Sequence, residues 1–119
     1  MSAAPIASWD EAAAFALSLP GTELSKSYGK PAVKIAANGR AFLATGHEPE
    51  TSFVVEIDLD TVEILKTTDP DTFWQTAHYE GWPAILVRFG SNDAERVRDV
   101  IGRARDQAAA KKPTRPRKK

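Results

Sequence analysis

The sequence predicts one small domain of the α+β class, an antiparallel sheet with helices packed on one side. The chain has 119 residues, which fits a single domain, and its 42% hydrophobic and 27% charged residues are typical of a globular protein. Stretches of alternating apolar and polar residues follow one another without helices between them, which favours antiparallel pairing. Amphipathic helical patterns near both ends supply the covering layer.

The first helix is expected to begin at Ser8, because Glu11 follows three residues later and the pair matches a capping box. Pro20 and Gly21 are expected to end this helix, since neither residue suits a helix interior. Its buried stripe, taken at helical spacing, is Ala12, Phe15, Ala16 and Leu19.

A β-hairpin is predicted around Asn38-Gly39, since both residues tolerate the positive φ of a tight turn. A two-residue loop would pair the flanking strands and set Val33 opposite Ala44 on one apolar face. The extended segments expected in this half of the chain are 22–28, 32–37, 40–45 and 53–57.

Two short helices are expected in the second half of the chain. Asp60 is a candidate N-cap for a helix that reaches Lys66. The sequence Asp-Pro-Asp at 69–71 is typical of another helix start, because proline suits the first helical position. That second helix would carry Phe73 and Trp74 at adjacent positions, so the two rings cannot point into the same core.

A strand at 85–89 and a last helix that begins at Ser91 complete the predicted fold. The order of elements is therefore α-β-β-β-β-α-α-β-α. The buried stripe of the last helix is expected to be Val97, Ile101, Ala104 and Ala108.

The chain is neutral overall, but its charges are distributed unevenly. Six of the sixteen basic residues lie in the last nine positions, which leaves ten basic against sixteen acidic residues, a net charge of −6, in residues 1–110. We therefore expect a folded domain over 1–110 and a disordered basic tail over 111–119. Such a tail favours DNA or another polyanion without sequence preference, with a solubilising extension as the alternative. Its cations are Lys111, Lys112, Arg115, Arg117, Lys118 and Lys119.

A second group of basic residues surrounds the predicted hairpin. On an exposed two-stranded wing these side chains could contact phosphates. The alternative is a solvated strand face, where lysine discourages edge-to-edge association. The candidate nucleic-acid-binding residues of the folded part are Lys26, Tyr28, Lys30, Lys34, Arg40 and Arg88.

Aromatic residues are dense between positions 73 and 89, and those that the core does not take would line a groove. One interpretation is that a ligand or a base stacks on them. The other is that they pack with their polar tips hydrogen-bonded. The candidate groove residues are Trp74, His78, Tyr79 and Trp82.

The sequence contains no catalytic, cofactor or metal motif that we can identify. There is no cysteine, and His78, which could act as an acid or base, has no partner that the sequence places beside it. His47 with Glu48 and Glu50 lacks the fixed helical spacing of a metal site. The apolar run at 12–17 is too short for a membrane span and has no basic segment before it, so we expect a cytoplasmic protein. We also expect a monomer that uses no cofactor.

Three segments together resemble the MmcQ/YjbR family: LPGT at 19–22, SYGKPA at 27–32 and DPDTFWQTAHYEGWPAILVRF at 69–89. The resemblance spans about residues 8–108. It implies a CyaY-like α+β fold, also likened to a double-wing DNA-binding arrangement, and a non-enzymatic DNA-binding or regulatory accessory protein. The alternative function is a small-molecule or protein-interaction module that uses the groove around Tyr79 and Trp82. The matched signature positions include Tyr28, Gly29, Lys30, His78, Tyr79, Gly81 and Trp82.

Overall fold

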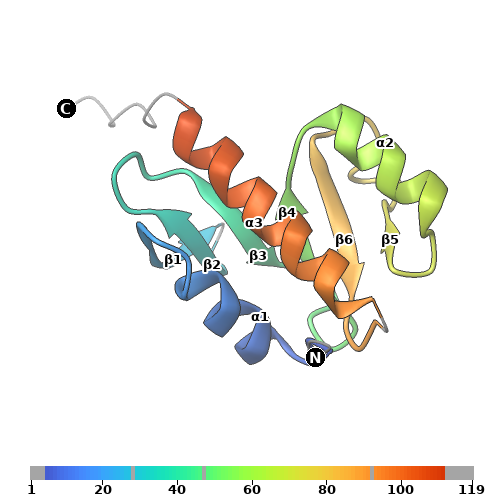
Figure 1. Cartoon of the computed structure of the whole chain (residues 1–119), viewed down its shortest axis with the longest axis horizontal. Coiled ribbons are helices and arrows are strands. Elements are labelled where there is room, and N and C mark those ends of the chain that lie inside the picture. The colour runs from blue at the N-terminus through green and yellow to red at the C-terminus, as the bar shows by residue number, and fades with distance from the viewer. Residues whose placement is uncertain (1–4, 28, 47, 92, 112–119) are drawn as a thin grey trace.

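One antiparallel sheet of six strands runs through the molecule, and the three helices of the described residues lie on one side of it (Figure 1). The computed structural model describes residues 5–27, 29–46, 48–91 and 93–111, so the predictions for Tyr28, His47 and the tail from 112 onward lie outside it. The predicted α+β class is confirmed. The elements are α1 (Trp9–Leu17), β1 (Thr22–Ser27), β2 (Lys30–Ile35), β3 (Ala41–Thr45), β4 (Ser52–Glu56), α2 (Leu59–Thr68), β5 (Phe73–Trp74), β6 (Ala84–Arg88) and α3 (Ala94–Ala110), with the strands in the order β1-β2-β3-β4-β6-β5.

The main core lies between the helices and the sheet. Successive residues of a strand face opposite sides, and on β4 the fully buried Phe53 and Val55 face the helices. Val55 pairs with Ile85 of β6, which belongs to the same core. Helix α3 crosses the strands (Figure 1) and buries its predicted stripe, which is confirmed as Val97, Ile101, Ala104 and Ala108.

The helix starts follow capping chemistry. Ser8 is confirmed as the N-cap of α1, because its hydroxyl accepts a hydrogen bond from the Glu11 N–H at 3.2 Å. The reciprocal half of the predicted capping box is displaced by one residue, since the Glu11 carboxylate accepts from the Ala7 N–H at 2.8 Å. Helix α3 begins later than the predicted Ser91, because Asp93 is its N-cap and accepts from the N–H of Arg96.

No helix in the described ranges is long and apolar enough to cross a membrane.

The predicted register of the hairpin is wrong. Ile35 and Arg40 close a loop of four residues rather than two, and Val33 pairs with Leu43 instead of Ala44. A bulge between Val33 and Lys34 accounts for the extra residue on β3. As a result the consecutive residues Phe42 and Leu43 both belong to the main core.

The side chain of Asn38 explains this longer loop. Its amide donates to the backbone oxygens of Ala108 and Lys111 at 2.8 and 3.2 Å, and its side-chain oxygen accepts from the Arg40 N–H at 2.9 Å. The turn is therefore shaped to reach the end of α3, a contact across seventy residues of sequence.

The prediction of a second helix after residue 69 is also wrong. Helix α2 is capped by Asp58, not Asp60, because Asp58 accepts hydrogen bonds from the N–H and the hydroxyl of Thr61. Asp69 is the C-cap of this helix, and its backbone oxygen closes a turn that leads into β5. Phe73 pairs with Val87, so the segment completes the sheet.

Candidate binding groove

The sheet face opposite the helices is only partly covered. Over β4 and β6 it carries a small apolar cluster of Val54, Ala84 and Leu86, against which Trp74 and Tyr79 pack. Because Phe73 and Trp74 lie on a strand, they point to opposite faces, and Phe73 is buried in the main core. The prediction that one core cannot hold both rings is thus confirmed, although a strand rather than a helix separates them.

A groove of about 700 Å³ lies beside this cluster. Ala44 and Val54 form its floor at the centre of the sheet, since the two residues pair across β3 and β4. Its walls come from the end of β3 on one side and from the loop between β5 and β6 on the other. The lining residues are Lys30, Ala44, Thr45, Gly46, Val54, Glu56, His78, Tyr79, Trp82, Pro83 and Ala84.

Gln75 holds the loop that forms the aromatic wall. Its amide nitrogen lies 2.9, 3.0 and 2.8 Å from the backbone oxygens of Tyr79, Trp82 and Ala84, and its oxygen accepts from Lys66 at 3.0 Å. One side chain therefore fixes both ends of the turn that presents Tyr79 and Trp82.

The turn leaves Trp82 projecting into solvent at the edge of the groove. Gly81 has a φ of +82°, which lets the chain turn tightly, and the Trp82 N–H donates to the Tyr79 oxygen at 2.8 Å. The Trp82 side chain remains 63% exposed. Tyr79 is half-buried, and its ring meets the edge of His78 with 4.8 Å between ring centroids. The groove thus has a wide aromatic surface for a ligand.

Two opposite charges lie in the groove. Lys30 is on its β2 side and Glu56 is at the end of β4. Loss of hydration raises the pKa of the Glu56 carboxyl, and the positive charges of Lys111 and Arg40 oppose this rise. Burial, and then the charge of Glu56, raise the pKa of Tyr79.

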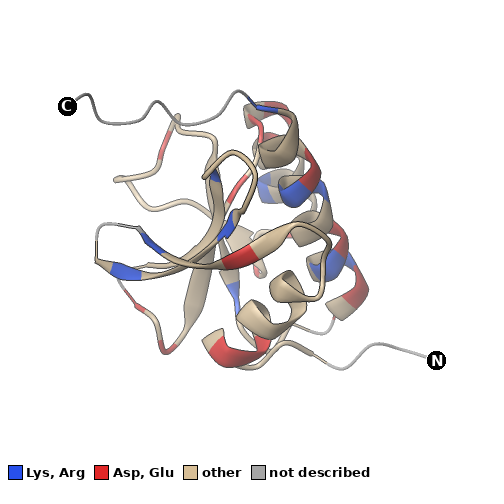
Figure 2. Ribbon diagram, turned by 90° about the vertical axis from the view of Figure 1, so that its left-hand side faces the viewer, with Lys and Arg blue, Asp and Glu red and all other residues tan. Residues whose placement is uncertain are grey.

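The predicted basic residues of the folded part do not form one surface. Lys34 is paired with Glu23 at 3.4 Å, and alternation along β1 places Lys26 on the other face from Glu23. Arg88 lies toward the far edge of the sheet, over the ring of Trp74. Figure 2 shows basic and acidic segments interspersed along the strands and the helices rather than gathered by sign.

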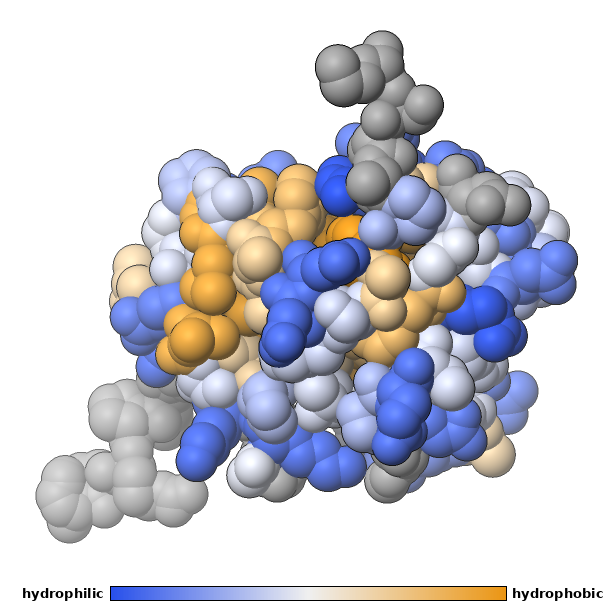
Figure 3. Space-filling view, turned by 90° about the horizontal axis from the view of Figure 1, so that it is seen from below, coloured by the Kyte–Doolittle hydropathy of each residue, from blue (hydrophilic) through white to orange (hydrophobic). Residues whose placement is uncertain are grey.

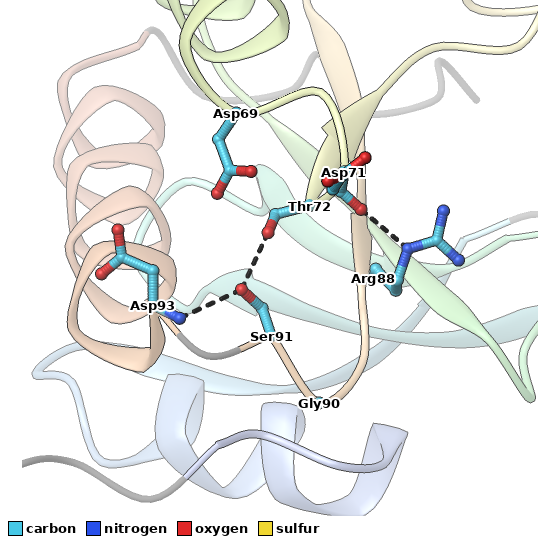
Figure 4. Close-up of a pocket in the computed structure, with 7 residues that line it drawn as sticks. All are labelled: Asp69, Asp71, Thr72, Arg88, Gly90, Ser91 and Asp93. Atoms are coloured by element: carbon cyan, nitrogen blue, oxygen red, sulfur yellow. Dashed lines mark hydrogen bonds between the residues drawn. The ribbon is translucent and has the colours of Figure 1, made fainter.

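A second cavity of about 460 Å³ lies beside the start of α3. Figure 4 shows Thr72 and Ser91 joined at its centre by a 2.8 Å hydrogen bond, while the guanidinium of Arg88 points away from the carboxylates of Asp69 and Asp93. Arg88 donates instead to the backbone oxygen of Asp71 at 2.7 Å. Within the described part of the chain no group of three or more acidic, histidine or cysteine side chains has the arrangement of a metal site. The polar groups here mostly serve turns and a helix cap.

Three of the four predicted groove residues, His78, Tyr79 and Trp82, do come together, whereas Trp74 packs against the small apolar cluster and does not line the groove. Lys30, which was predicted as a nucleic-acid-binding residue, also lines the groove. Sequence reasoning missed Glu56 and Gln75. Glu56 shows only as the polar member of a strand, and the role of Gln75 depends on a loop whose shape the sequence does not specify.

The surface seen in Figure 3 has apolar areas divided by hydrophilic side chains rather than one continuous apolar face.

Comparison of the chain with protein-family models, with curated proteins and with solved structures finds no match. The case for function therefore comes from the groove and from the sequence.

Proposed function

We propose that this protein is a binding module that holds a small amphipathic ligand in the groove on the open face of the sheet. The observation that carries this proposal is the groove itself, which combines an apolar floor, an exposed aromatic wall and two charged groups in about 700 Å³. Ligand sites are typically concave, mostly apolar and supplied with a few polar groups, and this volume is within their range.

The exposure of Trp82 supports the same function. Leaving a tryptophan 63% exposed forgoes the burial that this large ring would gain in a core. The loop that presents it is nevertheless fixed by the hydrogen bonds of Gln75. A rigid loop that presents an apolar ring beside a groove is arranged for contact with a ligand.

An environment-sensitive dye tests this function. We expect anilinonaphthalene sulfonate to fluoresce on binding the full chain and Trp82→Ala to remove most of that signal. Leu24→Ala is the matched control, because Leu24 is also 63% exposed but lies on β1, outside the groove. Equal dye binding by Trp82→Ala and the unaltered chain would contradict the proposal, provided that both remain folded by circular dichroism.

A second candidate is binding of DNA or another polyanion, and it is supported by the basic tail and the MmcQ/YjbR resemblance. The tail has six cations in nine residues. If all six contact phosphates, the logarithm of the DNA-binding constant should fall with the logarithm of the salt concentration with a slope of about −5. Within the folded part, the interspersed charges and the Lys34–Glu23 pair favour no phosphate surface. Removal of residues 111–119 should abolish DNA binding in a salt titration. Full affinity after removal of the tail would mean that the folded domain itself binds DNA.

A further inference from the structure

Within the described residues neither Lys30 nor Glu56 forms an ion pair, which sets them apart from Lys34 on the same face. Lys34 has Glu23 at 3.4 Å, whereas the one hydrogen bond that Lys30 makes within the described residues is a weak one to the oxygen of Gly46 at 3.5 Å. Within the described ranges Glu56 accepts no hydrogen bond and forms no ion pair, although Lys111 and Arg40 attract it from further away. The groove thus offers one cation and one anion for binding.

The strand register gives the separation of the two charges. Ala32, Ala44 and Val54 lie side by side on β2, β3 and β4. Lys30 is two residues from Ala32 toward one end of the strands, and Glu56 is two residues from Val54 toward the other. Their backbones are therefore ~13 Å apart along the strands and ~10 Å apart across them. Because both side chains are long, a ligand with its charges roughly 10 Å apart can reach both, a span of about three extended residues.

We propose that the ligand is a short zwitterion whose carboxylate bonds the Lys30 ammonium and whose ammonium bonds the Glu56 carboxylate, an inference that rests on the proposed function. The apolar middle of this ligand lies over Ala44 and Val54, with Trp82 beside it. A free tripeptide with an apolar central side chain has this form, and an ω-amino acid of similar length shares its two charges.

The balance of charge favours a zwitterion over a simple anion. An anion at Lys30 would leave Glu56 without a partner on the ligand and would be repelled by the Glu56 carboxylate. A cation alone would likewise leave Lys30 unpaired. A ligand with both charges forms two charge-assisted hydrogen bonds and brings no net charge into the groove.

Capped peptides test the proposal directly. Calorimetry would compare free Ala-Leu-Ala with its N-acetylated and C-amidated forms, and we expect each cap to weaken binding at least tenfold. Glu56→Gln should weaken the free peptide similarly and leave the N-acetylated form unaffected, while Lys30→Met should behave in the same way toward the C-amidated form. Lys34→Ala is the control and should keep full affinity, since Lys34 lies outside the groove.

The other outcomes separate this inference from the proposed function. Equal binding of free and capped peptides would overturn recognition of the two charges. If the dye binds the groove but neither peptides nor 8-aminooctanoate displace it, the zwitterion is wrong and the groove function stands. If neither dye nor peptide binds, both are wrong. If 8-aminooctanoate displaces the dye as effectively as the peptide does, recognition of the two charges is supported, and an ω-amino acid is favoured as the ligand.

Discussion

The two faces of the sheet are built from the same strands but are covered in different ways. On the helix side, Val55 and Ile85 are fully buried in the main core. On the other side, their neighbours Val54 and Leu86 are covered by Trp74 and Tyr79, and the cover stops where the groove begins. One face therefore stabilises the fold, and the other combines some stabilisation with an accessible site. Strand alternation makes the two separable by mutation.

The largest expected difference is between Val55→Ala and Val54→Ala, adjacent substitutions of the same residue type on opposite faces. We expect Val55→Ala to lower the free energy of unfolding by about 2–3 kcal/mol, because it leaves a closed cavity. Val54→Ala should cost about 1 kcal/mol, since water in the groove can enter the space. Urea denaturation measures both. Equal losses would mean that the open face is packed as tightly as the core.

Asn38→Ala should have the next largest effect, because Asn38 joins the hairpin to the helix side. Its loss removes the acceptor of the Arg40 N–H and the closer of two donors to the Ala108 oxygen, which keeps the Lys111 N–H at 3.2 Å, and the cost should be about 2 kcal/mol. Asn38→Asp is the informative comparison, since it keeps the acceptor for Arg40 but places a carboxylate against the end of α3. It should be no more stable than the alanine variant. A loss below about 0.5 kcal/mol for either would show that the turn does not depend on this contact.

The alternation of apolar residues allowed much of the helix side to be predicted, because burial imposes a period on the sequence. The stripe of α3 and the strand at 53–57 are examples. The groove could be predicted only in part. His78, Tyr79 and Trp82 were found from composition, but the shape that unites them depends on Gln75 and on a two-residue strand. Hydrogen bonds from one amide side chain to backbone oxygens four, seven and nine residues away impose no period on a sequence.

Gln75→Leu tests the counterpart of Asn38 on the open face. The leucine keeps the size of the side chain but cannot donate to the backbone oxygens of the loop, so we expect a loss of about 1–2 kcal/mol. Dye binding in the groove should fall as well, because Tyr79 and Trp82 lose their fixed positions. Lys66→Met removes the contact to the Gln75 oxygen and an exposed ion pair with Glu63 but leaves the three contacts of the Gln75 amide nitrogen, and it serves as the control. Unchanged dye binding by Gln75→Leu would show that the loop is held by other contacts.

Glu56→Gln should stabilise the fold at neutral pH, in contrast to the variants above. Loss of hydration raises the pKa of Glu56 in the folded state, so the ionised carboxylate opposes folding above that pKa. This penalty disappears as the pH falls through the raised pKa and the group takes up its proton. The advantage of Glu56→Gln in thermal unfolding should therefore shrink toward acidic pH. Glu50 lies on the loop before β4, outside the groove, and Glu50→Gln provides the control. An advantage that stays constant with pH would exclude the charge as its cause.

The smallest expected effect concerns Ser52, the first residue of β4. Ser52 is 1% exposed, and its hydroxyl has no hydrogen-bond partner within the described part of the chain. Removing an unsatisfied hydroxyl recovers its cost of burial, so Ser52→Ala should be neutral or stabilising by up to about 1 kcal/mol. Ser91→Ala is the opposite case, because it deprives the buried Thr72 hydroxyl of its 2.8 Å partner and should destabilise by about 1 kcal/mol. If the two alanine variants lose stability equally, Ser52 makes a hydrogen bond that matters to folding. A gain for Ser52→Ala would show that the sheet face without helices tolerates a buried hydroxyl that lacks a hydrogen bond. Among the described residues, the helix-covered face contains no buried side-chain polar atom of this kind.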